Sequence, residues 1–284
     1  MQKFNVRTDL AAEAHALRLS DGTPVEGVCC EEFSLHGVPA SRVRVENQMG
    51  ADAIGKPVGT YLTLEMEKYV NRRENSFSDC ASAVAELLAE LEAVKGAERY
   101  LIACLGNRAV TPDALGPEVA DKLIVTRHLK SAMPEEFAGF SSVSVLRTGV
   151  LGTTGIESAD SLSAICGAVK PDCVIAVDAL ASGEFRRLCR SIQICDSGIS
   201  PGSGVGNDRA ALSRETLGIP VVAVGVPTVI DASAFSNDEA AKGLFVTPRN
   251  IDELVKSTAK LIAYGINLAL HDGITIGDVD LLVE

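Results

Sequence analysis

No stretch of this sequence stays apolar over the roughly 18 residues that a membrane-spanning helix requires. The N-terminal stretch MQKFNVRTDL also lacks the continuous apolar segment of a secretory signal peptide. These two absences predict a cytoplasmic protein that has no membrane partner.

Positive charge is scarce. The chain has 26 Lys and Arg residues against 38 Asp and Glu, which gives a formal net charge of −12. Proteins that bind nucleic acid directly usually present clustered cations to the phosphate backbone. We therefore expect no direct nucleic-acid partner.

Motifs for metal or redox chemistry are missing as well. The eight cysteines form no C-x-x-C pair, and the four histidines show no i, i+4 spacing. Several cysteines lie in apolar runs such as IACLG and PDCVIAV, where a reduced thiol behaves as a small hydrophobic group. We expect buried thiols and no disulfide framework.

The pattern from about residue 98 onward is typical of a layered α/β fold, because short apolar runs alternate with amphipathic stretches. The nearly continuous apolar runs CVIAV and VVAVGV predict strands buried on both faces of a sheet, with helices on both sides. Predicted strands are Tyr100–Leu105, Val143–Leu146, Cys173–Val177, Ser191–Cys195 and Val221–Val226; predicted helices are Cys80–Val94, Pro117–Leu129, Ser158–Val169 and a long final helix capped by Asn250.

The first 97 residues show a different residue pattern from the rest of the chain. SRVRVE alternates like a half-exposed strand, and GKPVGT is rich in turn residues. We expect this subregion to form an edge hairpin layer over the main sheet. We predict a single α/β domain over residues 1–284, with 1–97 packed on the same core.

Two aspartates follow predicted strands. In an open α/β sheet, reacting groups gather at the carboxyl ends of the strands. Asp113 lies in GNRAVTPDALGP, where Gly106 and Asn107 suit a sharp turn, and Asp178 ends the apolar run VIAV. The carboxylate of Asp178, at the end of an apolar strand, is partly desolvated and needs a partner or a function. Asp113 can serve in a site or can equally well cap the next helix.

If the two carboxyl groups meet, their mutual repulsion keeps one protonated near neutral pH while the other stays ionised. Such a pair can activate a water molecule with one member and protonate a leaving group with the other. Asp113 and Asp178 are therefore our candidate catalytic residues.

A glycine-rich loop follows the strand Ser191–Cys195. Its GSGVG motif departs from the dinucleotide pattern G-x-G-x-x-G, and no lysine follows to form a Walker-type phosphate loop. The loop can let an extended peptide approach closely, form an anion nest from backbone N–H groups, or serve only as a structural loop. These alternatives stay open from the residues alone.

Motifs spread along the chain resemble the germination protease family of spore-forming bacteria and, more distantly, the hydrogenase maturation peptidases. The motifs occur in one order: VRTDLA, YLTLE, VTPDALGP, VTRHL, TGIES, VIAVDALA, DSGISPGSGVGN, ETLGIPVVAVGVPTV, FVTP and INLALH. The resemblance implies a phosphorylase/hydrolase-like three-layer α/β/α fold with a mixed sheet, a homotetramer and a location in the spore core. It also implies an endopeptidase that degrades small acid-soluble spore proteins during germination.

The resemblance assigns an atypical aspartic-type mechanism to Asp113 and Asp178, with cleavage beside a glutamate of the substrate. We expect no cofactor. We expect the glycine-rich loop to line the substrate crevice. Arg108 and Arg209 are candidate basic residues for binding the glutamate, although arginines at such positions are more often solvated surface charges. The loop's candidate substrate-binding residues are Gly202, Ser203, Gly204, Gly206 and Asn207.

The chain departs from the family pattern at three places. Family members are zymogens that remove a short N-terminal segment, and only Met1–Asn5 precede VRTDLA here. Better-known members carry a long segment where this chain has about ten residues before Phe245. Ser200 stands where members from bacilli have a histidine, so we predict that no metal is needed.

Two other functions remain as hypotheses. One is an anion- or nucleoside-binding, phosphorylase-like protein whose glycine-rich loop holds the ligand. The other is a folded but inactive relative of the peptidases.

Overall fold

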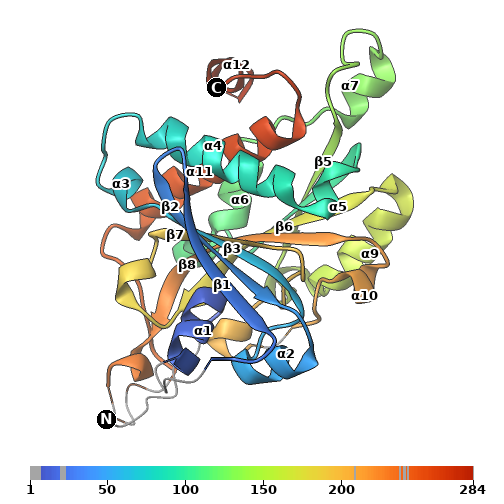
Figure 1. Cartoon of the computed structure of the whole chain (residues 1–284). Helices are drawn as coiled ribbons and strands as arrows, with labels where there is room; N and C mark the ends of the chain where they lie inside the picture. Colours follow the sequence, from blue (N-terminus) through green and yellow to red (C-terminus); the bar gives the residue numbers. More distant parts are fainter. Residues whose placement is uncertain are drawn as a thin grey trace.

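A computed structural model describes residues 8–19, 24–207, 209–236, 238, 241 and 243–283. These residues form one mixed sheet of nine strands in the order β1-β2-β3-β7-β8-β6-β4-β5, with β9 paired to β8 (Figure 1). The strands are β1 Val28–Leu35, β2 Val38–Val45, β3 Gly59–Glu65, β4 Arg99–Leu105, β5 Ser142–Gly149, β6 Cys173–Ser182, β7 Ser191–Cys195, β8 Val221–Asp231 and β9 Phe245–Val246.

The centre of the sheet is parallel: β8, β6, β4 and β5 run in one direction. Strand β7 joins β8 antiparallel, and β3, β2 and β1 continue the antiparallel part to the edge. Every residue of β7 is buried, and β6 and β8 each have one residue that is only partly buried. The apolar runs therefore correspond to strands covered on both faces, as predicted.

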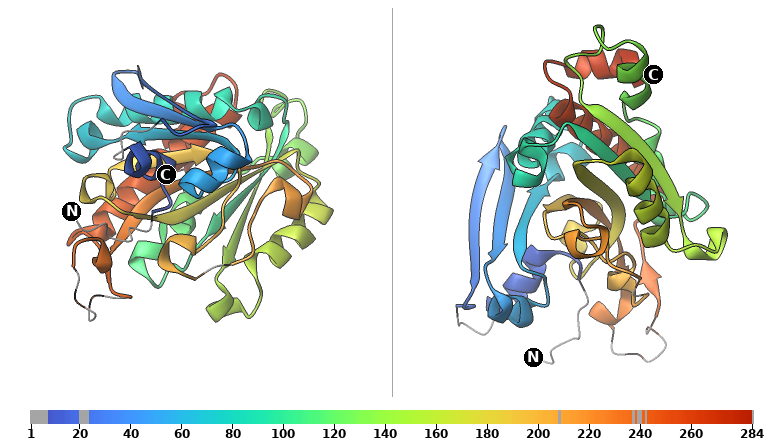
Figure 2. Two further views of the ribbon diagram at one scale, coloured as in Figure 1. Left: turned by 60° about the horizontal axis from the view of Figure 1, so that its bottom comes forward. Right: turned by 90° about the vertical axis from the view of Figure 1, so that its right-hand side faces the viewer.

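Helices cover both faces of the sheet, so the predicted three-layer α/β/α arrangement is confirmed (Figure 2). One face packs against α4, α6 and α11, whereas the other packs against α1 and α2 near β3 and against α9 near β4 and β6. The helices are α1 Ala11–Leu19, α2 Gln48–Ile54, α3 Glu67–Val70, α4 Ser76–Glu90, α5 Glu92–Lys95, α6 Leu115–Ala120, α7 Arg127–Ala132, α8 Leu151–Thr154, α9 Ser158–Val169, α10 Arg214–Leu217, α11 Ile251–Leu270 and α12 Ile276–Val283.

The predicted helix Pro117–Leu129 is wrong: the structure has two short helices, α6 and α7, with an irregular link between them. Asn267 of α11 stabilises this break. Its side chain accepts a hydrogen bond from the N–H of Ile124 (3.0 Å) and donates one to the carbonyl oxygen of Lys122 (2.9 Å). These backbone groups are thereby paired outside a helix.

Two smaller expectations about helices are only partly correct. The predicted helix Cys80–Val94 begins earlier, at Ser76, and is interrupted at Leu91, whose backbone is extended. Asn250 precedes α11 but makes no side-chain capping hydrogen bond, and its backbone is not in the extended conformation usual for an N-cap. The helix α9 has the predicted bounds.

The N-terminal subregion is not a layer over the sheet. Strands β1, β2 and β3 belong to the sheet itself, because β3 pairs with β7 in the register Tyr61↔Cys195. Residues of this subregion thus reach the interior of the sheet beside β7. The thiols of Cys29 and Cys30, on the edge strand β1, are exposed, and the other six cysteines are buried, with none in a disulfide.

Candidate active site

Asp178 lies inside β6 rather than at its end, which corrects the sequence-based bounds. Strand β6 continues to Ser182, but its neighbour β4 stops pairing at Cys104↔Val177. Asp178 is therefore the first residue of β6 beyond its pairing with β4, and it stays paired with Gly225 of β8 on the other side. Its side chain is 5% exposed, and its Oδ1 accepts a hydrogen bond from the N–H of Ala179 (2.9 Å).

Asp113 ends a 3₁₀ turn, Thr111–Asp113, in the loop that leaves β4. Its carboxylate accepts a hydrogen bond from the N–H of Asn107 (2.8 Å), and Ala114, not Asp113, occupies the N-cap of α6. The helix-cap interpretation of Asp113 is therefore wrong. Gly106 has φ of 107°, and a Cβ atom there would lie 2.0 Å from the carbonyl oxygen of Asp113, so the tight turn needs a glycine. Asn107 does not adopt a positive φ.

Both aspartates line one cavity of about 610 Å³, which we call the aspartate cavity. Burial raises the pKa of Asp113, and the hydrogen bond from Asn107 opposes this. Burial raises the pKa of Asp178 well above its usual value, and the charge of Asp113 adds to the effect. Two neighbouring carboxyl groups that differ in this way favour a state with one proton between them.

Asp9 is a third carboxylate at this site, and the sequence reasoning did not single it out. Its N–H donates to the carbonyl oxygen of Ala181 (2.9 Å), and its Oδ2 accepts from the N–H of Ala181 (2.8 Å). Its Oδ1 accepts from the hydroxyl of Ser203 (3.0 Å). The charge of Asp9 also raises the pKa of Asp178. Asp9 falls within VRTDLA, but no strand or turn pattern in the sequence marks it.

Glu13 holds the segment that carries Asp9. This side chain is 1% exposed, and its carboxylate accepts hydrogen bonds from the hydroxyls of Thr8 and Ser182 (both 2.6 Å) and from the N–H of Gly183 (2.7 Å). These contacts attach the start of α1 to the end of β6. Strand β6 therefore carries Asp178 and also holds the segment that contains Asp9.

The glycine-rich loop forms a wall between two cavities. Gly202, Gly204 and Asn207 line the aspartate cavity, whereas Ser203, Gly204 and Gly206 line a second cavity of about 1200 Å³. The N–H groups of four loop residues donate hydrogen bonds to carbonyl oxygens within residues 200–203, which does not favour an anion nest. These donors are Ser203, Val205, Gly206 and Asn207. Substrate binding by the loop stays a prediction.

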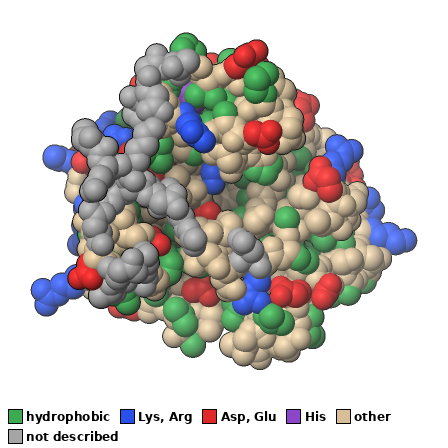
Figure 3. Space-filling view, turned by 90° about the horizontal axis from the view of Figure 1, so that it is seen from below, with side chains coloured by type: hydrophobic (Ala, Val, Ile, Leu, Met, Phe, Trp, Pro, Cys, Tyr) green, Lys and Arg blue, Asp and Glu red, His purple; other side chains and the backbone are tan. Residues whose placement is uncertain are grey.

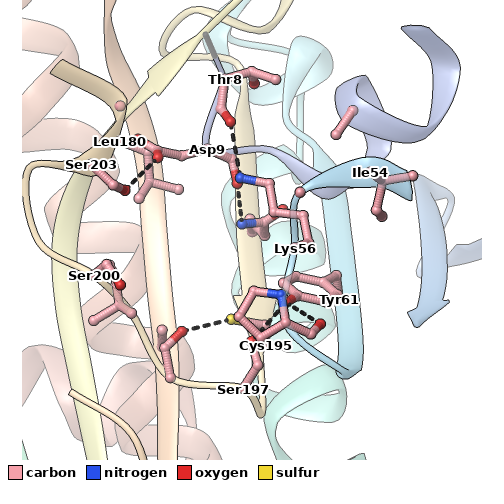
Figure 4. Close-up of a pocket in the computed structure, with 18 of the residues that line it drawn as sticks. Thr8, Asp9, Ile54, Lys56, Tyr61, Leu180, Cys195, Ser197, Ser200 and Ser203 are labelled. Carbon is pink, nitrogen blue, oxygen red and sulfur yellow. Dashed lines mark hydrogen bonds between the residues drawn. The ribbon is translucent and has the colours of Figure 1, made fainter. Parts of the chain in front are cut away.

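The second cavity, which we call the lysine cavity, is lined by Lys56 and Ser200 and shares Asp9, Leu180 and Gly204 with the aspartate cavity (Figure 4). Seen from below the view of Figure 1, the surface is hollowed near its centre, with acidic and basic side chains in the hollow (Figure 3).

The two arginines proposed to read a substrate glutamate already have acidic partners. Arg108 pairs with Asp121 and with Glu118 (3.3 Å) and does not line either cavity. Arg209 lines the aspartate cavity but pairs with Glu157 (3.2 Å), which lines it too.

Two features are absent from the part of the chain that the structure describes. There, no group of three or more His, Cys, Asp or Glu side chains is placed to hold a metal ion. None of the described helices combines the length and apolar character needed to cross a bilayer. The segment Met1–Asn5, on which the zymogen expectation depends, lies outside the described residues.

Comparison with known proteins places these features in a family. The family model for the germination protease matches residues 7–242. A germination protease from Caldanaerobacter subterraneus subsp. tengcongensis is 39% identical, and the match covers 99% of this chain and 99% of the relative. A germination protease from Halalkalibacterium halodurans is 41% identical over 98% of this chain and 78% of the relative.

Among solved structures, a NiFe hydrogenase maturation protease, HycI from Thermococcus kodakarensis KOD1, matches 64% of this chain and 98% of its own. The sequence identity is 25% and the TM-score is 0.39. The family model spans most of the chain, and the sequence relatives match nearly all of it. The chain therefore belongs to the germination protease family of peptidases.

Proposed function

We propose that this protein is an endopeptidase in which Asp113 and Asp178 share one proton and direct a water molecule onto a peptide carbonyl. The observation that carries the proposal is that both carboxyl groups line one cavity and that both have raised pKa values. Asp178, the more deeply buried, holds the proton, and Asp113 remains the ionised member.

In this mechanism Asp113 accepts a proton from the water molecule as its oxygen bonds to the peptide carbon. Asp178 donates its proton to the peptide as the carbon–nitrogen bond breaks, so the amine leaves neutral. The Asp113 proton then restores the starting state of the pair. A carboxyl group that is still protonated near neutral pH is suited to this donation, because general acids act best when their pKa lies near the working pH.

Membership of the family supports small acid-soluble spore proteins as the substrates, degraded during germination in the spore core. Synthesis as a zymogen and assembly as a homotetramer are parts of the same proposal. Incubation of the purified protein with a small acid-soluble spore protein tests the activity directly. Intact substrate under every activation condition would favour an inactive relative instead.

The pH profile tests the shared proton. We expect kcat/KM to rise as Asp113 ionises and to fall as Asp178 loses its proton, which gives a bell-shaped curve. Since burial raises both pKa values, both limbs should lie above the ordinary aspartate range, with the alkaline limb well above it. A single acid limb at the ordinary aspartate pKa, followed by a flat plateau, would contradict the mechanism.

Gly204→Ala tests the wall between the cavities. The added Cβ would lie 2.1 Å from Oδ2 of Asp9 and 2.6 Å from Cβ of Ala181, so the loop or Asp9 must move. We expect kcat/KM to fall by about 10- to 100-fold, because small displacements of positioning groups are costly in catalysis. Gly139→Ala is the control, since its Cβ would meet no atom within 4 Å, and it should keep normal activity.

A further inference from the structure

The lysine cavity lies on the opposite side of the glycine-rich loop from the aspartate cavity. The two cavities share three lining residues, Asp9, Leu180 and Gly204, so they adjoin each other across these residues. Figure 4 shows Lys56 reaching toward Thr8 and Asp9, with Tyr61 and Cys195 farther along the same cavity. The mechanism proposed above uses none of the polar side chains that line the lysine cavity.

Lys56 occupies the turn between α2 and β3, directly after Gly55, the left-handed C-cap of α2. Its ammonium donates one hydrogen bond, to the carbonyl oxygen of Thr8 (2.9 Å). Within the described part of the chain, it has no carboxylate at ion-pairing distance. Because an ammonium group has three donors, two remain available to a ligand.

The polar neighbours of Lys56 are already engaged. The carboxylate of Asp9 is bound by Ala181 and Ser203, and the side chain of Gln193 bonds to Ala11 and to the carbonyl oxygen of Asp9. The hydroxyl of Tyr61 donates to the carbonyl oxygen of Pro57 (2.8 Å).

Burial lowers the pKa of Lys56, and the charges of Asp9 and Glu13 only partly oppose this. An anion bound beside the ammonium would favour its charged form. Arg18, an exposed residue that also lines the cavity, adds a second cation.

We propose that the lysine cavity is a substrate subsite in which Lys56 binds the carboxylate of an acidic side chain close to the scissile bond. The inference rests on the proposed peptidase function. It assigns recognition of an acidic side chain to Lys56, rather than to Arg108 or Arg209, which already have carboxylate partners. A peptide is the occupant because the lysine cavity adjoins, across Asp9, Leu180 and Gly204, the cavity where the peptide bond would be cleaved.

Blocked peptides test this assignment. One series carries a single glutamate at successive positions, and a matched series carries glutamine there; both ends are capped so that no terminal carboxylate remains. For the wild-type protein we expect kcat/KM to favour glutamate at one position by about 30-fold or more, and for Lys56→Met we expect this ratio to fall close to one. Equal ratios in the wild type and Lys56→Met would overturn the subsite.

Lys68→Met is the matched control. Its ammonium also donates to a backbone carbonyl, that of Gly37 (2.8 Å), but lies outside both cavities. This variant should keep the wild-type preference for glutamate. Thermal unfolding of Lys56→Met should show a folded protein, because methionine replaces the stem of a lysine whose charge is disfavoured by burial.

Measurements of peptide binding, without cleavage, test this inference separately from the proposed function. Calorimetry with Asp178→Asn, which is not expected to cleave, measures the affinity for the best glutamate peptide, its glutamine match and a glutamine peptide with a free C-terminal carboxylate. Tighter binding of the glutamate peptide that is lost on adding Lys56→Met supports the subsite, even if the wild type cleaves nothing and the peptidase proposal fails. Selective binding of the free C-terminus instead, or no difference among the three peptides, overturns it.

Discussion

Asp178→Asn is expected to lower kcat/KM for a small acid-soluble spore protein by about 10³-fold or more, while the protein remains folded. The amide has nearly the same shape and can still accept the hydrogen bond from Ala179, but it cannot supply the proton held by the pair. Asp113→Asn should cause a loss of similar size, because it removes the group that accepts the proton from water. Digestion assays with each purified variant measure both losses.

The same substitution should stabilise the fold at alkaline pH. Burial and neighbouring charges raise the pKa of Asp178 in the folded state, so the protonated form contributes stability that is present at low pH and is lost as pH rises through the folded pKa. Asparagine carries no such penalty. We expect a gain of about 1 kcal/mol or more at pH 9, or roughly 2–4 °C in Tm, and little gain at pH 4.

Asp121→Asn provides the control for these measurements. Asp121 pairs with Arg108 and Arg147 at the surface and does not line the aspartate cavity. Its replacement should leave kcat/KM unchanged. A folded Asp178→Asn protein that cleaves at the wild-type rate would remove Asp178 from the mechanism.

Glu13→Ala is expected to have the largest effect on stability, about 3–5 kcal/mol in the free energy of unfolding. The substitution leaves the N–H of Gly183 without its buried acceptor and the hydroxyl of Ser182 with only the carbonyl oxygen of Glu184, and it opens a cavity beside them. Since Glu13 also holds Thr8, Asp9 should lose its fixed position and activity should fall. Urea unfolding and kcat/KM measure the two consequences.

Two further variants serve as controls for Glu13→Ala. Glu13→Gln keeps one acceptor oxygen and should cost less than the alanine variant. Glu92→Ala removes a carboxylate that is 89% exposed and should change stability by no more than about 0.5 kcal/mol. If Glu13→Ala unfolds at the same urea concentration as the wild type, the buried network does not stabilise the attachment of α1.

The strands that support the site were predictable because their burial requires apolar residues over their whole length. The runs around Ala176 and Val224 have this character, and the two aspartates could be located from the ends of such runs. The break between α6 and α7 could not be predicted locally. It depends on Asn267, whose hydrogen-bond partner Ile124 lies 143 residues away in the sequence.

Asp9 and Lys56 escaped prediction for a similar reason. The carboxylate of Asp9 meets the N–H of Ala181 across 172 residues, and Lys56 meets the carbonyl of Thr8 across 48. In the sequence the first precedes a helix and the second stands in a turn, where charged residues are usually solvated. The tertiary fold, which pairs β3 with β7, brings Asp9 beside Asp178 and Lys56 beside Thr8.

Strand β6 carries both the carboxyl group of Asp178 and the residues, Ala181 and Ser182, that hold the N-terminal segment. The chain itself therefore fixes the spacing between them. Asp178, Ala181 and Ser182 follow one another on a strand whose side chains alternate between the faces of the sheet. Inserting or deleting one residue between Asp178 and Ala181 would turn every later side chain of the strand to the opposite face. The spacing from Asp178 to Ala181 should therefore tolerate less change in length than the loops around the site.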